Sequence, residues 1–193
     1  MKLPKKFPEL RSVITEITSI VIGVLLALAV NEWNESRIQT ARANEAIQNV
    51  MHEITSNTKF LSFVNANNRA IIELLKERNA QSEDEGERQF VPGLQIQDTA
   101  WRMLHSTGVS EFIEYSTLYE ISAIYSLQDI YKSLGYQLVQ TITNNRALIL
   151  AVAPDKSEGI DSGLFLSEMI LIEQVEEALL SSYAEALEKL ENR

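Results

Sequence analysis

The sequence contains no cysteine, and it has few residues that interrupt a helix. Without a thiol the chain cannot form disulfides, zinc–thiolate centres or a lipid-bearing cysteine, and it lacks a cysteine nucleophile. Its 193 residues include only 7 glycines and 4 prolines. Glu, Leu, Ala, Gln and Ile instead form long runs, a composition that favours helix over sheet. We therefore expect an all-α fold.

Positive charge is scarce outside the first sixteen residues. The chain has a net charge of −10, yet residues 1–16 hold four basic and two acidic side chains, so the remainder carries −12. An acidic body repels phosphate backbones, and we expect no nucleic-acid partner. Because 45% of the residues are hydrophobic, the body is expected to fold rather than to stay disordered.

One apolar run lies between Glu16 and Glu32 without a charge and ends in the exit Asn-Glu-Trp-Asn-Glu. With its flanks, the helix over 13–33 is about 30 Å long, the thickness of the hydrocarbon core of a bilayer. Trp33 would then lie at one membrane interface, where its amphipathic ring is favoured. We interpret 13–33 as a retained transmembrane helix.

Two other interpretations of this run stay open. A cleaved export signal fits the basic start and the small-x-small pattern Ala27-Leu28-Ala29. A buried helix of a soluble core is also apolar, although usually on one face only. The retained span is favoured because no polar segment precedes the alanines and the helical pattern continues past them.

Basic residues predict the orientation. Four of them precede the span, whereas only Arg37 and Arg42 follow within a comparable distance. The side with more basic residues is normally cytoplasmic. The sequence therefore predicts a short basic cytoplasmic arm (1–12), a transmembrane helix (13–33) and an acidic extracytoplasmic helical bundle (34–193), with the lipid bilayer as one partner.

Small residues recur every four positions along the predicted span. Ser19, Gly23, Ala27 and Asn31 fall on one stripe, where two helix backbones can approach closely and Asn31 can form a hydrogen bond across the contact. This stripe is a candidate self-association face. The alternative is that small residues are simply frequent in membrane spans.

The N-terminal third resembles a family of uncharacterised bacterial single-span membrane proteins. The residues that carry the resemblance are Glu16-Ile17, the run Ile22-Gly23-Val24-Leu25-Leu26-Ala27-Leu28 and the exit Asn31-Glu32-Trp33-Asn34-Glu35, with a weaker likeness at Asp98-Thr99-Ala100-Trp101. Members share an "E-I…IGVLIAL…N-x-WNE" signature before a helical body. The resemblance implies a single-pass protein of the bacterial inner membrane and no assigned chemistry.

The body shows helical apolar periodicity, which predicts helices over about 34–78, 99–107, 116–152 and 163–190. A connector over 79–97 and a turn-rich loop over 153–162 separate them. Asn57 and Asn68 fall within the apolar seam of the first body helix, and we interpret them as a wet edge rather than as determinants of helix register. The glutamates of the last helix are typical of a solvated face: Glu173, Glu176, Glu177, Glu185, Glu188 and Glu191.

No catalytic, cofactor-binding or metal-binding pattern emerges. His52-Glu53 lacks the second histidine of a zinc-protease helix, because Ser56 stands in its place, and His105 is the only other histidine. Five tyrosines crowd residues 115–136; they favour half-buried bundle positions over a ligand pocket. We therefore expect no enzyme and no cofactor.

The pattern as a whole predicts a membrane-anchored, non-enzymatic interaction or scaffold protein that forms a homo-oligomer or binds a membrane protein partner. Two alternatives stay open: an accessory subunit of a larger membrane complex, and a periplasmic ligand-sensing helical module.

Overall fold

The computed structural model describes residues 8–78, 95–152 and 162–192. These residues form helices α1 (Pro8–Arg78), α2 (Thr99–Ser106), α3 (Tyr115–Val152) and α4 (Ser162–Glu191), with a short 3₁₀ helix η1 (Val109–Phe112). No strand occurs within the described ranges, and the expected all-α class is confirmed. The ends of α2, α3 and α4 and the C-terminal end of α1 lie within one residue of the predicted ones. Helix α1 begins at Pro8, five residues before the predicted span and inside the predicted basic arm over 1–12, and η1 is not predicted.

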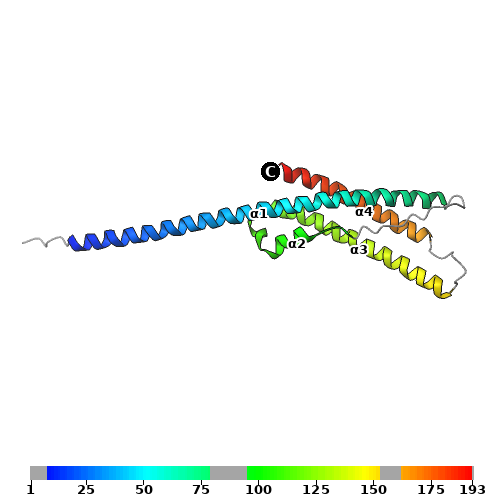
Figure 1. Ribbon diagram of the computed structural model, residues 1–193, viewed down its shortest axis with the longest axis horizontal. Helices are drawn as coiled ribbons and strands as arrows, with labels where there is room; N and C mark the ends of the chain where they lie inside the picture. Colours follow the sequence, from blue (N-terminus) through cyan, green and yellow to red (C-terminus); the bar gives the residue numbers. More distant parts are fainter. Residues whose placement is uncertain (1–7, 79–94, 153–161, 193) are drawn as a thin grey trace, which may run out of the picture.

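Helix α1 is 71 residues long, or roughly 105 Å at about 1.5 Å per residue. Pro8 occupies its first position, where the missing N–H costs nothing. Beyond Pro8 the helix contains no proline and only one glycine, Gly23, so nothing in its sequence stops it. Its first half projects alone, and its second half packs with the other helices (Figure 1).

The three long helices form an elongated bundle in which α1 and α3 run in the same direction and α4 runs back in the opposite one, packed against both (Figure 1). Side-chain contacts give the register. Thr141 of α3 meets Glu168 of α4, and Glu120, much earlier in α3, meets Lys189 near the end of α4. This inverse order identifies α3 and α4 as antiparallel.

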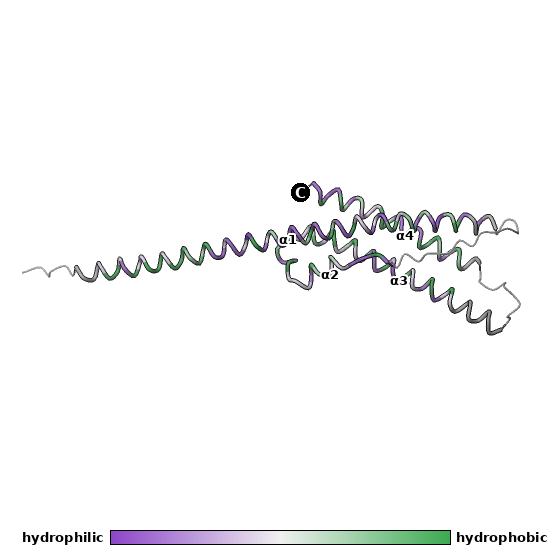
Figure 2. The backbone as a smooth tube through the Cα atoms, viewed as in Figure 1, coloured by the Kyte–Doolittle hydropathy of each residue, from purple (hydrophilic) through white to green (hydrophobic). Residues whose placement is uncertain are grey.

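The core lies along α4, where the apolar stripes of α1 and α3 converge. These stripes are the ones that periodicity predicts, and their buried members are Ala43, Val50, Ile54, Leu61, Val64 and Ile71 in α1, Ile124, Tyr131 and Leu138 in α3, and Met169, Ile172, Leu179, Tyr183, Ala186 and Leu190 in α4. Figure 2 shows hydrophobic positions alternating with hydrophilic ones along each packed helix.

Helix α2 and η1 pack against α1 at the end of the bundle from which the free half of α1 projects. Asp98 is the N-cap of α2, but its side chain makes no capping bond. It pairs instead with Lys132 at 3.0 Å and Arg102 at 3.2 Å. Gly108 follows the helix with a φ of 70°, a left-handed conformation that glycine adopts without strain.

Three expected segments lie partly outside the described residues. These parts are residues 1–7 of the basic arm, 79–94 of the connector and 153–161 of the turn-rich loop.

Candidate functional site: an exposed apolar helix and a buried polar network

The projecting half of α1 exposes an apolar surface. Every side chain from residue 12 to residue 38 is exposed, and eleven large aliphatic residues between Val13 and Val30 are each about half exposed or more. Within the described part of the chain, this is the one helix long and apolar enough to span a membrane, and none of its most apolar stretch is buried. Figure 2 shows this apolar stretch, followed by polar positions where α1 joins the bundle.

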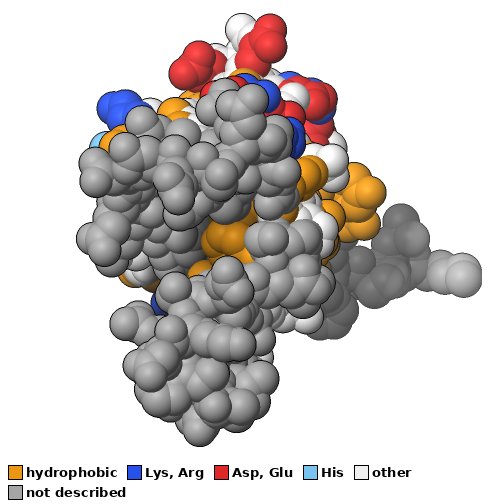
Figure 3. Space-filling model, turned by 90° about the vertical axis from the view of Figure 1, so that its right-hand side faces the viewer, with side chains coloured by type: hydrophobic (Ala, Val, Ile, Leu, Met, Phe, Trp, Pro, Cys, Tyr) orange, Lys and Arg blue, Asp and Glu red, His pale blue; other side chains and the backbone are white. Residues whose placement is uncertain are grey.

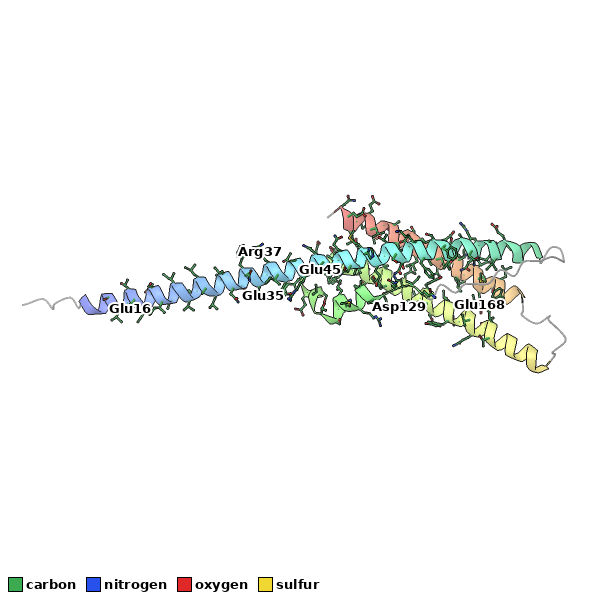
Figure 4. The ribbon with its side chains drawn as sticks, viewed as in Figure 1. Glu16, Glu35, Arg37, Glu45, Asp129 and Glu168 are labelled. Carbon is green, nitrogen blue, oxygen red and sulfur yellow. The ribbon has the colours of Figure 1, made fainter. Side chains whose placement is uncertain are left out.

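Charged side chains bound this stretch. Glu16 lies near its start, and Glu35 and Arg37 lie beyond its end, all on the free part of α1 (Figure 4). Trp33 is 63% exposed, and the Arg37 guanidinium lies 5.1 Å from the centre of its ring, a cation–π contact.

The predicted self-association residues lie along this free half of α1. Ser19, Gly23, Ala27 and Asn31 are all exposed, and a Cβ added at Gly23 would meet no atom within 4 Å. The stripe is therefore open along its length. Whether it contacts another chain stays a prediction.

Inside the bundle, Glu53 joins three helices. Its Oε1 accepts a 2.6 Å hydrogen bond from the Tyr125 hydroxyl of α3. Its Oε2 accepts a 2.8 Å bond from the backbone N–H of Ala100, in the first turn of α2. A glutamate of α1 thus supplies the N-terminal cap that Asp98 does not.

Aromatic packing surrounds this contact. The Trp101 ring stacks on Tyr125 at 5.0 Å and 6°, and His105 meets Trp101 edge-on at 4.1 Å. Burial and the bond to Glu53 raise the pKa of Tyr125, so the phenol stays protonated and keeps donating to Glu53. The contact fixes the positions of α1, α2 and α3 relative to one another.

Glu176 is a second carboxylate inside the bundle, and it is fully buried. Its Oε1 accepts hydrogen bonds from Asn68 Nδ2 at 2.8 Å and from the Tyr131 hydroxyl at 2.9 Å. Its Oε2 accepts a bond from Asn65 Nδ2 at 3.1 Å. Burial raises the pKa of Glu176, although the three donors act in the opposite direction.

Two further polar contacts complete the network. Asn57 binds the backbone of Gln97 through both amide atoms, donating to its C=O at 2.8 Å and accepting from its N–H at 2.9 Å. Gln128 Nε2 donates to the hydroxyl of Tyr183 at 2.7 Å. Each pair ties one helix to another segment; the Gln128–Tyr183 bond is buried, and the two bonds to Gln97 are partly buried.

Three expectations about these residues are wrong. Asn57 and Asn68 do not form a wet edge, because both are buried. Glu176 does not belong to a solvated face, although its neighbours Glu173 and Glu177 do bind the exposed Arg69 at 2.8 and 2.7 Å. In Figure 3 acidic and basic side chains gather along the top of the view.

The five tyrosines do not share one pocket. Tyr125 and Tyr131 are buried, whereas Tyr115, Tyr119 and Tyr136 are exposed. Neither a common ligand pocket nor uniform half-burial describes them.

A groove of about 550 Å³ runs between α3 and α4. Most of the residues that line it are apolar or small, and three are charged: Tyr119, Ala123, Ile124, Ser126, Leu127, Ile130, Ser182 and Ala186, with Glu120, Glu185 and Lys189. Lys189 Nζ bridges the two glutamates, at 3.2 Å from Glu120 and 2.9 Å from Glu185.

The chain matches no protein-family model, no curated protein and no solved structure. The family resemblance of the N-terminal third therefore stays a prediction carried by its residues.

Proposed function

We propose that the chain is a membrane-anchored, self-associating interaction protein without catalytic activity, held in a bacterial inner membrane by residues 13–33. The observation that carries the proposal is the exposure of an apolar surface along the whole projecting half of α1. Exposed apolar area costs about 25 cal/mol per Å² in water, and insertion into a bilayer removes that cost. Because α1 continues without a break into the bundle, the anchor positions the acidic module directly.

The basic residues before the span support an orientation with the bundle outside the cytoplasm. Two surfaces support an interaction role: the small-residue stripe of α1 and the apolar groove between α3 and α4. In this view the protein acts by holding a partner or a second copy at the membrane surface.

Membrane anchoring is tested by fractionation of the expressed full chain. We expect the wild type to resist alkaline extraction and to need detergent, whereas Leu25→Arg combined with Leu26→Arg should move it toward the aqueous fraction. Phe63→Arg is the matched control, because Phe63 is equally exposed but lies in the bundle. Wild-type chain released without detergent, or a mature product that starts near Val30, contradicts the proposal.

Orientation is tested with one introduced thiol, since the chain has no cysteine of its own. Ser62→Cys lies at an exposed bundle position. A membrane-impermeant maleimide should label it in spheroplasts with intact membranes. Labelling only after lysis places the bundle in the cytoplasm and overturns the proposed orientation.

A further inference from the structure

The carboxylate of Glu176 lies at the meeting point of α1, α3 and α4, and none of the cationic side chains that the structure describes is bonded to it. All three donors to it are neutral: the amides of Asn65 and Asn68 and the hydroxyl of Tyr131. The guanidinium of Arg69, on α1, binds the neighbouring Glu173 and Glu177 instead. A fully buried carboxylate without a cationic partner is expensive in its ionised form, and protonation relieves that cost.

The amide of Asn68 has the atom that a protonated Glu176 needs. Its Nδ2 donates to Glu176 Oε1, while its Oδ1 is buried and has no hydrogen-bond partner among the described residues. An amide carries its donor and its acceptor on the same planar group. Rotation of the amide by a half-turn therefore brings Oδ1 to the Glu176 carboxylate in place of Nδ2. No hydrogen bond of Oδ1 has to break for this rotation.

We propose that Glu176 is a proton-binding site that makes the contact between α1 and α4 depend on pH. In the ionised state Asn65, Asn68 and Tyr131 all donate to the carboxylate. Uptake of one proton from solvent on Oε1 converts the carboxylate to a carboxylic acid, and the Asn68 amide turns so that its Oδ1 accepts the new O–H. The acid form has no buried charge and is the more compact state. In the ionised form the carboxylate gains from hydration, which loosens α1 from α4.

The surrounding groups are consistent with this assignment. From α1 the site is faced by Asn65 and Asn68, with Arg69 at its edge, and from α3 by Tyr131. On α4 itself Glu173 lies one turn away, and its negative charge adds to burial in raising the pKa of Glu176. All of these contacts lie inside the bundle, so proton binding at Glu176 does not depend on the proposed membrane role.

The first test detects the proton directly in the full-length chain in detergent. Infrared spectroscopy distinguishes the C=O stretch of a protonated carboxyl group from the bands of an ionised one. We expect wild type to retain one such band at pH values where ordinary glutamates, with a pKa of about 4.3, are ionised. The band should be lost in Glu176→Gln and kept in Glu188→Gln, an exposed glutamate of the same helix. Its absence from wild type, or its persistence in Glu176→Gln, overturns the assignment.

The second test measures the conformational coupling. Spin labels on Ser62→Cys of α1 and Gln174→Cys of α4 occupy exposed positions on the two helices, and no native thiol competes for them. We expect the distance distribution between the labels to broaden and lengthen as pH rises, with the same midpoint as the infrared band. The distribution should stay narrow at all pH values in Glu176→Gln. A distance distribution that does not change with pH in wild type, or that still changes with pH in Glu176→Gln, refutes the coupling between proton binding and the α1–α4 contact.

Discussion

The hydroxyl of Tyr125 donates a 2.6 Å hydrogen bond to the carboxylate of Glu53 across 72 positions of sequence. Both residues are buried, and the other carboxylate oxygen holds the N–H of Ala100. One side chain of α1 therefore fixes both the position of α3 and the start of α2.

Removal of the Tyr125 hydroxyl tests how much its hydrogen bond to Glu53 contributes to stability. Tyr125→Phe keeps the ring that stacks on Trp101 but leaves Glu53 Oε1 without its donor. A hydrogen bond to a charged group contributes about 1.5–3 kcal/mol, and we expect that loss in the free energy of unfolding, measured by urea titration in detergent with circular dichroism. Tyr136→Phe, at an exposed position, should change it by less than about 0.5 kcal/mol. Equal effects of the two substitutions would contradict the role of the Glu53 contact.

Asn57 fixes the segment that leads into α2, because its amide pairs with both backbone groups of Gln97. Asn57→Ala leaves these groups without partners, and we expect a loss of about 2 kcal/mol in the free energy of unfolding. Amide hydrogen exchange should also accelerate in α2. Asn67→Ala provides the matched control on the same helix, since the buried Nδ2 of Asn67 has no hydrogen-bond partner. This control should be close to neutral, and a loss as large as that of Asn57→Ala would show that the Gln97 contact is not the cause.

Helix position and helix burial are largely readable from this sequence, because each long helix has an apolar stripe and few interruptions. The stripe around Ile172, Leu179 and Tyr183 even contains the signal for Glu176, which falls at the three-four spacing between Ile172 and Leu179. The many glutamates of α4 hide this signal, since six others in the same helix do not belong to the stripe. A glutamate in register with an apolar stripe is the pattern that indicates a buried carboxylate.

The hydrogen-bond partners of the buried polar groups cannot be predicted from the sequence in the same way. Asn65 and Asn68 meet Glu176 across more than 100 residues. That pairing depends on the direction and register of α4 against α1, which periodicity within one helix does not contain. The cap of α2 is a similar case, because the local sequence offers Asp98 and the bundle instead supplies Glu53.

Stability should depend on pH through Glu176. Burial raises its pKa in the folded chain. Below the pKa of the unfolded chain, about 4.3, Glu176 is protonated in both the folded and the unfolded state, and its contribution to stability is fully present. As pH rises from there through the folded pKa, the folded state holds a proton that the unfolded state has released, so stability falls. In urea titrations at a series of pH values, Glu176→Gln should lose this slope and exceed wild type in stability at high pH, while Glu188→Gln follows wild type. A wild-type stability that rises with pH relative to Glu176→Gln would contradict the raised pKa.

Gly108 holds the connection between α2 and η1 in a left-handed conformation, with a φ of 70°. A Cβ added there meets nothing within 4 Å, so Gly108→Ala introduces backbone strain without a clash. We expect a loss of about 1 kcal/mol in the free energy of unfolding. Gly108→Asn should recover part of it, because asparagine tolerates this conformation better than alanine. Alanine and asparagine variants of equal stability would show that the left-handed turn is not what limits this position.

The self-association proposal makes a specific prediction at Gly23. A larger side chain there meets no atom of its own chain, so Gly23→Leu should leave the bundle and its unfolding free energy unchanged. If the stripe of Ser19, Gly23, Ala27 and Asn31 packs against a second copy, the added side chain separates the two backbones. The mass of the detergent-solubilised particle, measured by light scattering, should then fall from an oligomer to the monomer. Ala29→Leu is the control, because it makes a similar small-to-large change on another side of the same exposed helix segment. An oligomer that survives Gly23→Leu, or one that is lost equally in Ala29→Leu, would remove the stripe as the contact.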